Sequence, residues 1–149
     1  MAQQAPPDRH SPPRLLAIDP GSRRTGVAVS DDLGLFAHAR PALVVAGEAR
    51  LVEAVRELVE AEQADEVIVG LPLSMSGLDS AQTARVRDLV MRLRKVLPVP
   101  VTPWDERLSS VQARRDVRDR DRSGTLDSAA AALVLQSVLD ARRTGARAE

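Results

Sequence analysis

The sequence predicts a single α/β domain built on one five-stranded mixed sheet with helices packed against it. Three short apolar segments in the first third of the chain are separated by tight polar turns, which is typical of antiparallel strands. The remainder alternates between helical periodicity and short apolar runs, which is typical of parallel strands joined by crossover helices. The 149 residues, 44% of them hydrophobic, are enough for one core of ordinary size.

The first three strands are expected to form an antiparallel section. A buried-type run from Arg14 to Ile18 is followed by the turn PGSRRT and by a second apolar run from Gly26 to Ser30. A third strand fits the segment from Phe36 to Val45. The short turns between them leave no room for a crossover helix, so neighbouring strands must run in opposite directions.

The first helix is predicted by apolar residues that recur with helical spacing after the third strand. They share one face and leave charged residues on the other: Leu51, Val55, Leu58 and Val59. The segment EVIVGLP, ended by Gly70 and Pro72, then predicts a buried fourth strand.

A second helix and an edge strand come next. Apolar residues on one face predict a helix between Val86 and Leu97. The segment PVPVTPWDE predicts the fifth strand, and its prolines suit the edge of a sheet because proline cannot donate a ladder hydrogen bond. A short helix from Ser109 or Ser110 and an Ala-rich helix from Thr125 to about Arg142 complete the domain.

The two ends of the chain lack this patterning. Residues 1–13 hold four prolines among polar residues and are predicted to be a disordered tail, with residues 143–149 a flexible one and 14–142 the folded domain. No apolar run reaches the roughly 18 residues of a membrane span, and the N-terminus has no signal-type apolar region. We therefore expect a cytoplasmic protein that does not bind membranes.

The composition excludes several kinds of site. Without cysteine there is no disulfide, no thiolate metal centre and no cysteine nucleophile. The formal net charge of zero argues against a uniformly basic nucleic-acid-binding protein. Of the 21 basic residues, however, 20 are arginine, whose planar guanidinium group suits phosphate. A GC-rich genome would also favour arginine codons, so this bias alone does not decide the function.

Three carboxylates are expected to meet at one edge of the sheet. Asp19 stands at the C-terminal end of the first strand, Glu106 at that of the fifth, and Asp127 in the first turn of the last helix. Ligands in open α/β sheets bind at the carboxyl ends of strands. If the first and fifth strands flank the fourth, they lie roughly 10 Å apart, and two inward side chains can close most of that gap. Without a cation the carboxylates would repel each other, so the cluster predicts Mg²⁺ or Mn²⁺.

Each carboxylate also has a simpler interpretation. Asp19 precedes Pro-Gly and can begin a turn. Glu106, next to Asp105, can be a solvated strand end, and Asp127 can favour a helix N-terminus through the macrodipole. These interpretations do not explain why all three lie around one sheet edge, so we favour a metal site.

Two loops are expected beside the carboxylates. In the turn after the first strand, Gly21 lets the backbone pass close to a ligand, and Arg23 and Arg24 place positive charge there. An exposed hairpin tip with solubilising charge is the alternative. The loop after the fourth strand, which contains Ser74, either lines the substrate groove or is a plain connector.

Four blocks of the sequence resemble the YqgF/RuvX-type members of the RNase H-like nuclease superfamily: AIDPGSRRTGVAVSD, VIVGLPLSMSG, DERLSSVQA and LDSAAAALVLQSVLD. They occur in the family's order and span Arg14 to about Asp140. The resemblance implies an RNase H-like fold, with helices on both faces of the sheet and acidic site residues at Asp19, Glu106 and Asp127. The family usually has M-D-G or M-N-G where this chain has Met-Ser-Gly at 75–77.

The resemblance implies a nuclease, that is, a metal-dependent phosphodiesterase. Family members are described as nucleases that mature the 5′ end of the 16S ribosomal RNA precursor or as Holliday-junction resolvase-like enzymes. Metal ions held by the carboxylates would activate water and stabilise the leaving 3′ oxygen. We expect phosphate oxygens to be held by arginines: Arg23, Arg24 and Arg107. Other arginines lie on basic faces that could follow the nucleic-acid backbone, among them Arg114 and Arg115.

Structured RNA is the expected substrate, with a branched DNA junction as the alternative. A symmetric junction is best cut by a rigid two-fold dimer, and the helix faces show no obvious self-complementary apolar patch. We therefore expect a monomer or a weak homodimer. Only Phe36 and Trp104 could stack on bases at a junction centre. A non-catalytic RNA- or ribosome-binding module would be expected to lack a carboxylate, and all three are present.

Overall fold

One mixed sheet of five strands organises the part of the chain that the computed structural model describes, residues 11–73, 80–108 and 128–145. The strand order is β3-β2-β1-β4-β5. The strands are β1 (Leu15–Pro20), β2 (Thr25–Ser30), β3 (Ala37–Leu43), β4 (Glu66–Leu71) and β5 (Val101–Asp105). The first three pair antiparallel, whereas β4 pairs in parallel with both β1 and β5. The predicted mixed sheet is confirmed, and β1 and β5 do flank β4.

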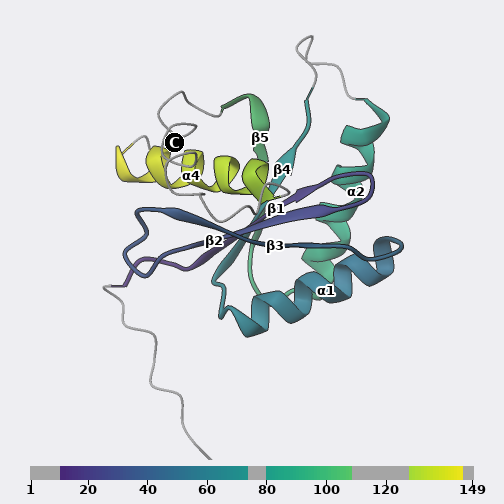
Figure 1. Cartoon of the computed structure of the whole chain (residues 1–149), viewed down its shortest axis with the longest axis horizontal. Coiled ribbons are helices and arrows are strands. Elements are labelled where there is room, and N and C mark those ends of the chain that lie inside the picture. Colours follow the sequence, from purple (N-terminus) through teal and green to yellow (C-terminus); the bar gives the residue numbers. More distant parts are fainter. Residues whose placement is uncertain (1–10, 74–79, 109–127, 146–149) are drawn as a thin grey trace, which may run out of the picture.

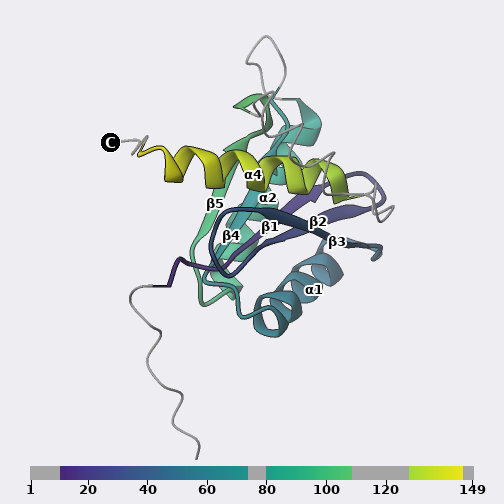
Figure 2. The ribbon, with the colours of Figure 1, turned by 60° about the vertical axis from the view of Figure 1, so that its left-hand side comes forward.

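Helices cover both faces of this sheet. The α-helices are α1 (Glu48–Ala61), α2 (Ala81–Val96) and α4 (Ala129–Arg143), and a 3₁₀ turn, η1 (Glu106–Leu108), follows β5. Helices α1 and α2 lie against one face, while α4 crosses the other (Figures 1 and 2). None of the helices described here is long and apolar enough to cross a membrane.

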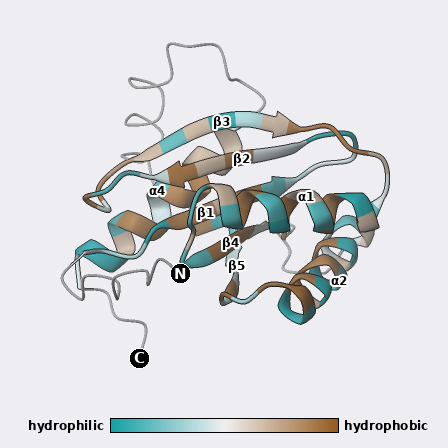
Figure 3. Cartoon of the chain, turned by 90° about the horizontal axis from the view of Figure 1, so that it is seen from below, coloured by the Kyte–Doolittle hydropathy of each residue, from teal (hydrophilic) through white to brown (hydrophobic). Residues whose placement is uncertain are grey.

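The alternation of side chains along the strands divides the core into two layers. In β1, Leu16 and Ile18 pack with α1 and α2, whereas Leu15 and Ala17 pack with α4. Apolar and polar residues alternate along the helices in Figure 3, as expected for helices that bury one side only. The two faces of the sheet therefore have separate apolar cores.

Polar side chains attach α4 to the antiparallel strands. The buried Ser128 hydroxyl accepts a hydrogen bond from the Val27 N–H (3.0 Å) and donates one to the Arg40 carbonyl (2.6 Å). Val27 and Arg40 face each other in the β2–β3 ladder, so the hydroxyl stands between two backbone groups that would otherwise pair. The buried Gln136 side chain accepts from the Ala37 N–H at 3.0 Å. These bonds fix the start of α4 and its middle relative to the sheet.

Several element boundaries differ from the prediction. Strand β5 begins at Val101 instead of residue 98, because the two prolines before it cannot donate ladder bonds. Glu106 opens the 3₁₀ turn instead of ending the strand. Helix α1 begins at Glu48, one turn before the first residue of the predicted stripe. The predicted helix at 109–110, the residues 125–127 at the start of the last helix, and most of both predicted tails lie outside the described residues.

Candidate active site

The first site residue, Asp19, lies on β1 next to β4. It pairs with Gly26 of β2 on one side, and on the other side the β1–β4 register ends with Ile18 opposite Val69. Ala17 faces α4, so Asp19, two residues further along, points to the same face of the sheet. Gly70 is the β4 residue next to it. The carboxylate therefore stands on the α4 face at the carboxyl end of the strand.

Gly70 provides the space in which two carboxylates meet. A Cβ atom at this position would lie 3.0 Å from Glu106 Oε1, 3.4 Å from Asp19 Oδ1 and 3.4 Å from Val134 Cγ2 of α4. Both carboxylates thus reach over the same glycine from the strands on either side. The predicted convergence of Asp19 and Glu106 is present, and the absent side chain on β4 makes it possible.

The two carboxyl groups share a proton. A hydrogen bond to Asp19 raises the pKa of Glu106 to about 8, and burial and the negative charges of Asp19 and Asp105 act in the same direction. Two carboxylates this close cannot both ionise freely without a positive charge between them. Glu106 therefore keeps a proton at neutral pH until a cation takes its place.

This pair of oxygen donors suits a hard divalent cation. Mg²⁺ and Mn²⁺ prefer carboxylate oxygens, and Mg²⁺ is commonly held by one or two carboxylates that leave other positions open. Among residues 11–73, 80–108 and 128–145, no three His, Cys, Asp or Glu side chains lie close enough to hold a metal together. The third predicted ligand, Asp127, lies outside these ranges, immediately before Ser128.

The turn after Asp19 is closed by a backbone hydrogen bond. The Gly21 N–H donates to the Arg24 carbonyl at 2.9 Å. A Cβ atom on Gly21 would lie 2.7 Å from that carbonyl oxygen, so the turn requires glycine here. Gly21 is thus explained by the turn itself. Arg23, in contrast, lines a pocket on the α1/α2 side of the sheet.

Arg107, predicted to hold phosphate, contacts a carboxylate of its own chain. Its guanidinium group binds Asp105 through Nε (3.0 and 3.1 Å) and Nη2 (2.8 Å), and its backbone N–H donates to the same group. These bonds hold the pKa of Asp105 below its usual value. Asp105 is therefore engaged by Arg107, which leaves Asp19 and Glu106 as the paired carboxylates. Three further predicted contacts, Ser74, Arg114 and Arg115, fall outside the described residues.

Sequence reasoning missed the role of Gly70 and the anchoring of α4. The sequence pattern predicts Gly70 only as the end of the fourth strand, although a glycine between two strands that end in acids is a signal for a close approach of groups from both sides. Ser128 directly follows the predicted acid Asp127 and looked like part of the same helix start. Its place between β2 and β3 depends on how α4 packs, and no local pattern reveals it.

The strand order and the carboxylate pair above Gly70 define an RNase H-like domain of the nuclease class. A family model described as "RuvX: Holliday junction resolvase" matches residues 13–141, so the chain belongs to the RuvX family. The family expected from the four sequence blocks is therefore confirmed.

Relatives from two bacteria extend over nearly the same region. A protein of Koribacter versatilis (strain Ellin345) is 39% identical over 134 residues, which cover 87% of this chain and 88% of the relative. A protein of Halothermothrix orenii (strain H 168) is 36% identical over 132 residues, covering 85% and 94%. Both carry the name "Putative pre-16S rRNA nuclease".

Solved structures show the same fold. RuvC of Thermus thermophilus in complex with a Holliday junction substrate has a TM-score of 0.66 at 16% identity, covering 88% of this chain and 96% of that one. The fowlpox virus Holliday junction resolvase has a TM-score of 0.54 at 14% identity, covering 86% and 99%. The predicted RNase H-like fold is confirmed.

Proposed function

We propose that the protein is a divalent-metal-dependent nuclease that hydrolyses phosphodiester bonds in the precursor of 16S ribosomal RNA. The observation that carries the proposal is the convergence of the Asp19 and Glu106 oxygens above Gly70. Two acidic groups that converge from the carboxyl ends of strands on either side of a third strand are typical of a site built for a bound cation.

Asp19 and Glu106, with Asp127 as a third ligand, would hold Mg²⁺ or Mn²⁺. When bound, such a cation supplies the positive charge that lowers the barrier to phosphodiester hydrolysis. Glu106 must lose its proton to become a ligand, because its pKa of about 8 keeps it largely protonated at neutral pH. The Arg107–Asp105 pair next to it keeps a second negative charge neutralised and holds the chain after β5 in place.

Arginines near the carboxylates would hold the substrate. Arg23 and Arg24 follow Asp19 in the same turn, and guanidinium groups bind phosphate oxygens through paired hydrogen bonds. Gly21 keeps this turn tight and so fixes where both arginines begin. Ser74, Arg114 and Arg115 are proposed as further contacts along the nucleic acid.

The names of the relatives favour RNA. Proteins 36% and 39% identical to this chain are named for the 16S rRNA precursor, and such a substrate places the protein in the cytoplasm. The description of the family model favours the second candidate, cleavage of four-way DNA junctions. A junction resolvase needs two active sites in a symmetric dimer, whereas processing of one RNA end needs only one.

Cleavage by matched variants tests the proposal. Asp19→Asn and Glu106→Gln each remove a charged ligand oxygen at constant size, and we expect each to reduce cleavage of a 16S precursor at least ~10³-fold, which equals about 4 kcal/mol of barrier. Glu57→Gln, an exposed change on α1, is the control and should leave cleavage unchanged.

A four-way junction and the RNA precursor are assayed side by side with Mg²⁺ or Mn²⁺. Cleavage of the junction alone, in paired symmetric nicks, would replace the RNA assignment with the junction assignment. Wild-type cleavage by Asp19→Asn would contradict the site itself. Calorimetric titration with Mn²⁺ should show binding that both carboxylate variants weaken.

A further inference from the structure

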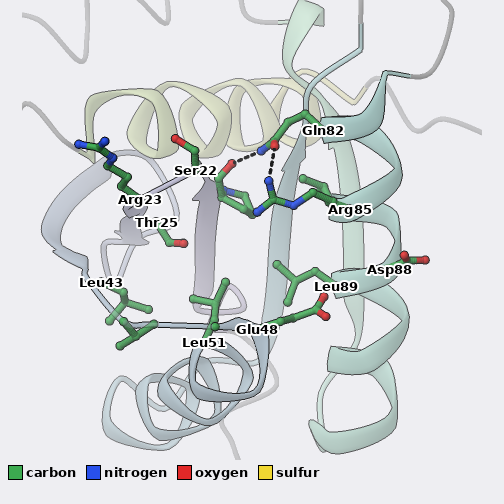
Figure 4. A pocket seen from close by; sticks show the side chains of 15 residues that line it. Ser22, Arg23, Thr25, Leu43, Glu48, Leu51, Gln82, Arg85, Asp88 and Leu89 are labelled. Carbon is green, nitrogen blue, oxygen red and sulfur yellow. Dashed lines mark hydrogen bonds between the residues drawn. The ribbon is translucent and has the colours of Figure 1, made fainter.

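A pocket lies on the face of the sheet opposite the carboxylates. It has a volume of about 210 Å³ and is enclosed by the β1–β2 turn, the end of β3, the start of α1 and the first half of α2 (Figure 4). Asp19 points to the α4 face, whereas Thr25 and Leu51 face this pocket on the α1/α2 side. The turn that begins at Pro20 therefore separates this pocket from the carboxylates at one end of the sheet.

The upper part of the pocket is polar and cationic. Arg23 and Arg85 are both among its lining residues, but only the Arg85 guanidinium group is directed into it, whereas that of Arg23 points away in Figure 4. Gln82 donates to the Pro20 carbonyl at 3.2 Å, and Arg85 donates to the Gln82 side-chain oxygen at 3.3 Å. This chain of bonds holds the Arg85 guanidinium group toward the turn, as Figure 4 shows.

A threonine hydroxyl points into the same space. Thr25 is only 4% exposed, and its hydroxyl makes no hydrogen bond with the described residues. Figure 4 shows this hydroxyl directed into the pocket. The hydroxyl can donate or accept a hydrogen bond, so it offers a polar contact to an occupant of the pocket.

The lower wall is aliphatic. It is formed by the side chains of Leu43, Val45, Leu51, Val86 and Leu89. Pockets for drug-sized ligands have volumes of roughly 300–1,000 Å³, so a pocket of about 210 Å³ suits one flat ring system and not two. An occupant with one flat ring, a polar edge and an anionic group matches the three walls.

The two acidic residues of the pocket do not cancel its positive charge. Glu48 is paired with Arg92, whose Nη1 lies 3.1 Å from its Oε2. Asp88 points away from the pocket, on the outer side of α2 in Figure 4. Arg85 therefore leaves the upper wall positive, which favours an anion over a cation.

We propose that this pocket binds a nucleoside monophosphate unit, with the base against the aliphatic wall and Thr25, and the phosphate at Arg85. The unit can come from a free mononucleotide or from an unpaired nucleotide of a bound nucleic acid. Only the second source rests on the proposed nuclease function, because the pocket and the carboxylates lie on opposite faces of the sheet.

The test uses adenosine 5′-monophosphate, adenosine and inorganic phosphate, each titrated into ¹⁵N-labelled full-length protein in EDTA. We expect the monophosphate to shift amide resonances around the turn and the starts of α1 and α2, with a Kd at least tenfold lower than that of adenosine or phosphate. Equal affinities for monophosphate and phosphate, or no shifts at these amides, would overturn the nucleotide assignment.

Variants locate the binding. Val45→Trp fills the pocket from a surface position that tolerates change, and it should abolish binding of the monophosphate. Thr25→Val should weaken binding about fivefold or more, while Thr25→Ser, which keeps the hydroxyl, should not. Arg50→Gln, an exposed α1 residue outside the pocket, is the charge control for Arg85→Gln. Unchanged binding in Val45→Trp, or equal losses in Arg50→Gln and Arg85→Gln, would contradict the site.

A competition experiment identifies the source of the nucleotide. A 5′-phosphorylated RNA hairpin with an unpaired end is added to the complex with adenosine monophosphate, still in EDTA so that no cleavage occurs. Displacement of the monophosphate assigns the pocket to an unpaired nucleotide of the nucleic acid, and retention assigns it to a free mononucleotide. Loss of nuclease activity in every assay would leave the direct binding of adenosine monophosphate standing.

Discussion

The two faces of the sheet are built in different ways. The face toward α1 and α2 has an apolar core of valine and leucine, with Val55, Val67 and Leu93 fully buried. The face toward α4 contains more small residues: five of the eleven buried hydrophobic residues in its core are alanine, among them Ala17 and Ala131. It also contains the buried polar anchors Ser128 and Gln136.

This difference indicates a division of roles. Large aliphatic side chains remove much apolar surface from water, and that burial is the main source of folding free energy. Small side chains bring α4 close to the strands, and buried hydrogen bonds then define where the helix lies. We infer that the α1/α2 face mainly stabilises the domain, and that the α4 face mainly positions the carboxylates.

A core truncation on the α1/α2 side gives the largest expected effect. Leu93→Ala removes a fully buried side chain and should lower the free energy of unfolding by about 2–5 kcal/mol, with no change in activity per folded molecule. Urea unfolding with a parallel cleavage assay measures both. Met91→Ala, which is 54% exposed on the same helix, is the control and should cost no more than ~0.5 kcal/mol. A proportional loss of activity in folded Leu93→Ala would show that the faces do not act separately.

A methyl group added on the α4 face should instead reduce activity and leave the stability of the fold nearly unchanged. Gly70→Ala places a carbon 3.0 Å from Glu106 Oε1, so the Glu106 carboxylate must shift, whereas Asp19 Oδ1 at 3.4 Å stays at an ordinary contact distance. We expect the rate to fall by up to about 10²-fold, the cost of a misplacement of about 1 Å, while the free energy of unfolding should fall by at most about 1 kcal/mol because a flexible side-chain end can move aside. Single-turnover cleavage and urea unfolding separate the two quantities. Full activity would show that the carboxylates need not meet above Gly70.

Two serines of α4 compare anchoring with simple burial. Ser128→Ala leaves the Val27 N–H and the Arg40 carbonyl without their shared partner, and we expect a loss of about 1–3 kcal/mol in the free energy of unfolding. Ser137 is equally buried, but its hydroxyl only donates to the Leu133 carbonyl within the helix. Ser137→Ala should therefore cost less than ~0.5 kcal/mol. Amide hydrogen exchange at Val27 should accelerate only in Ser128→Ala, and equal effects of the two changes would remove the special role of Ser128.

The sequence predicted the sheet and the meeting of Asp19 with Glu106 because both depend on local patterns. Strand periodicity identifies each strand, and the short turns and crossover helices then restrict the strand order. With β1 and β5 on either side of β4, acids after both strands have to meet. The contribution of Gly70 could not be predicted in the same way, since it depends on the register between β4 and its neighbours.

Features that depend on packing between distant segments also escaped prediction. The pocket beside Arg85 exists because Gln82 of α2 bonds to the Pro20 carbonyl, 62 residues earlier in the chain. The pairing of Arg107 with Asp105 depends on the 3₁₀ turn that follows β5. Nothing in the sequence around Arg85 or Arg107 reveals which partner each of these arginines will contact.

The smallest expected effect is a pH dependence that comes from the α4 face alone. The pKa of Glu106 is about 8 in the folded protein and about 4.5 when unfolded, so the folded state binds its proton more tightly. The contribution of this proton to the free energy of unfolding is complete below pH 4.5 and is lost as the pH rises toward 8. One pKa unit corresponds to about 1.4 kcal/mol, but solvent screening weakens the effect for a half-buried group. We therefore expect the free energy of unfolding to fall by about 1–2 kcal/mol over this pH range.

Urea unfolding in EDTA from pH 5 to 8 should therefore show a decline for wild type that is absent in Glu106→Gln. The carboxylates with lowered pKa values, Glu62 and Glu66 among them, act in the opposite direction and below this range, because their contribution is lost only as the pH falls. Saturating Mg²⁺ should also flatten the wild-type decline, since a bound cation replaces the shared proton. The same binding should release up to one proton near pH 7, which calorimetry in buffers of different ionisation enthalpy detects. An identical decline in both proteins would assign the titration to another group and would leave the carboxylate pair without its shared proton.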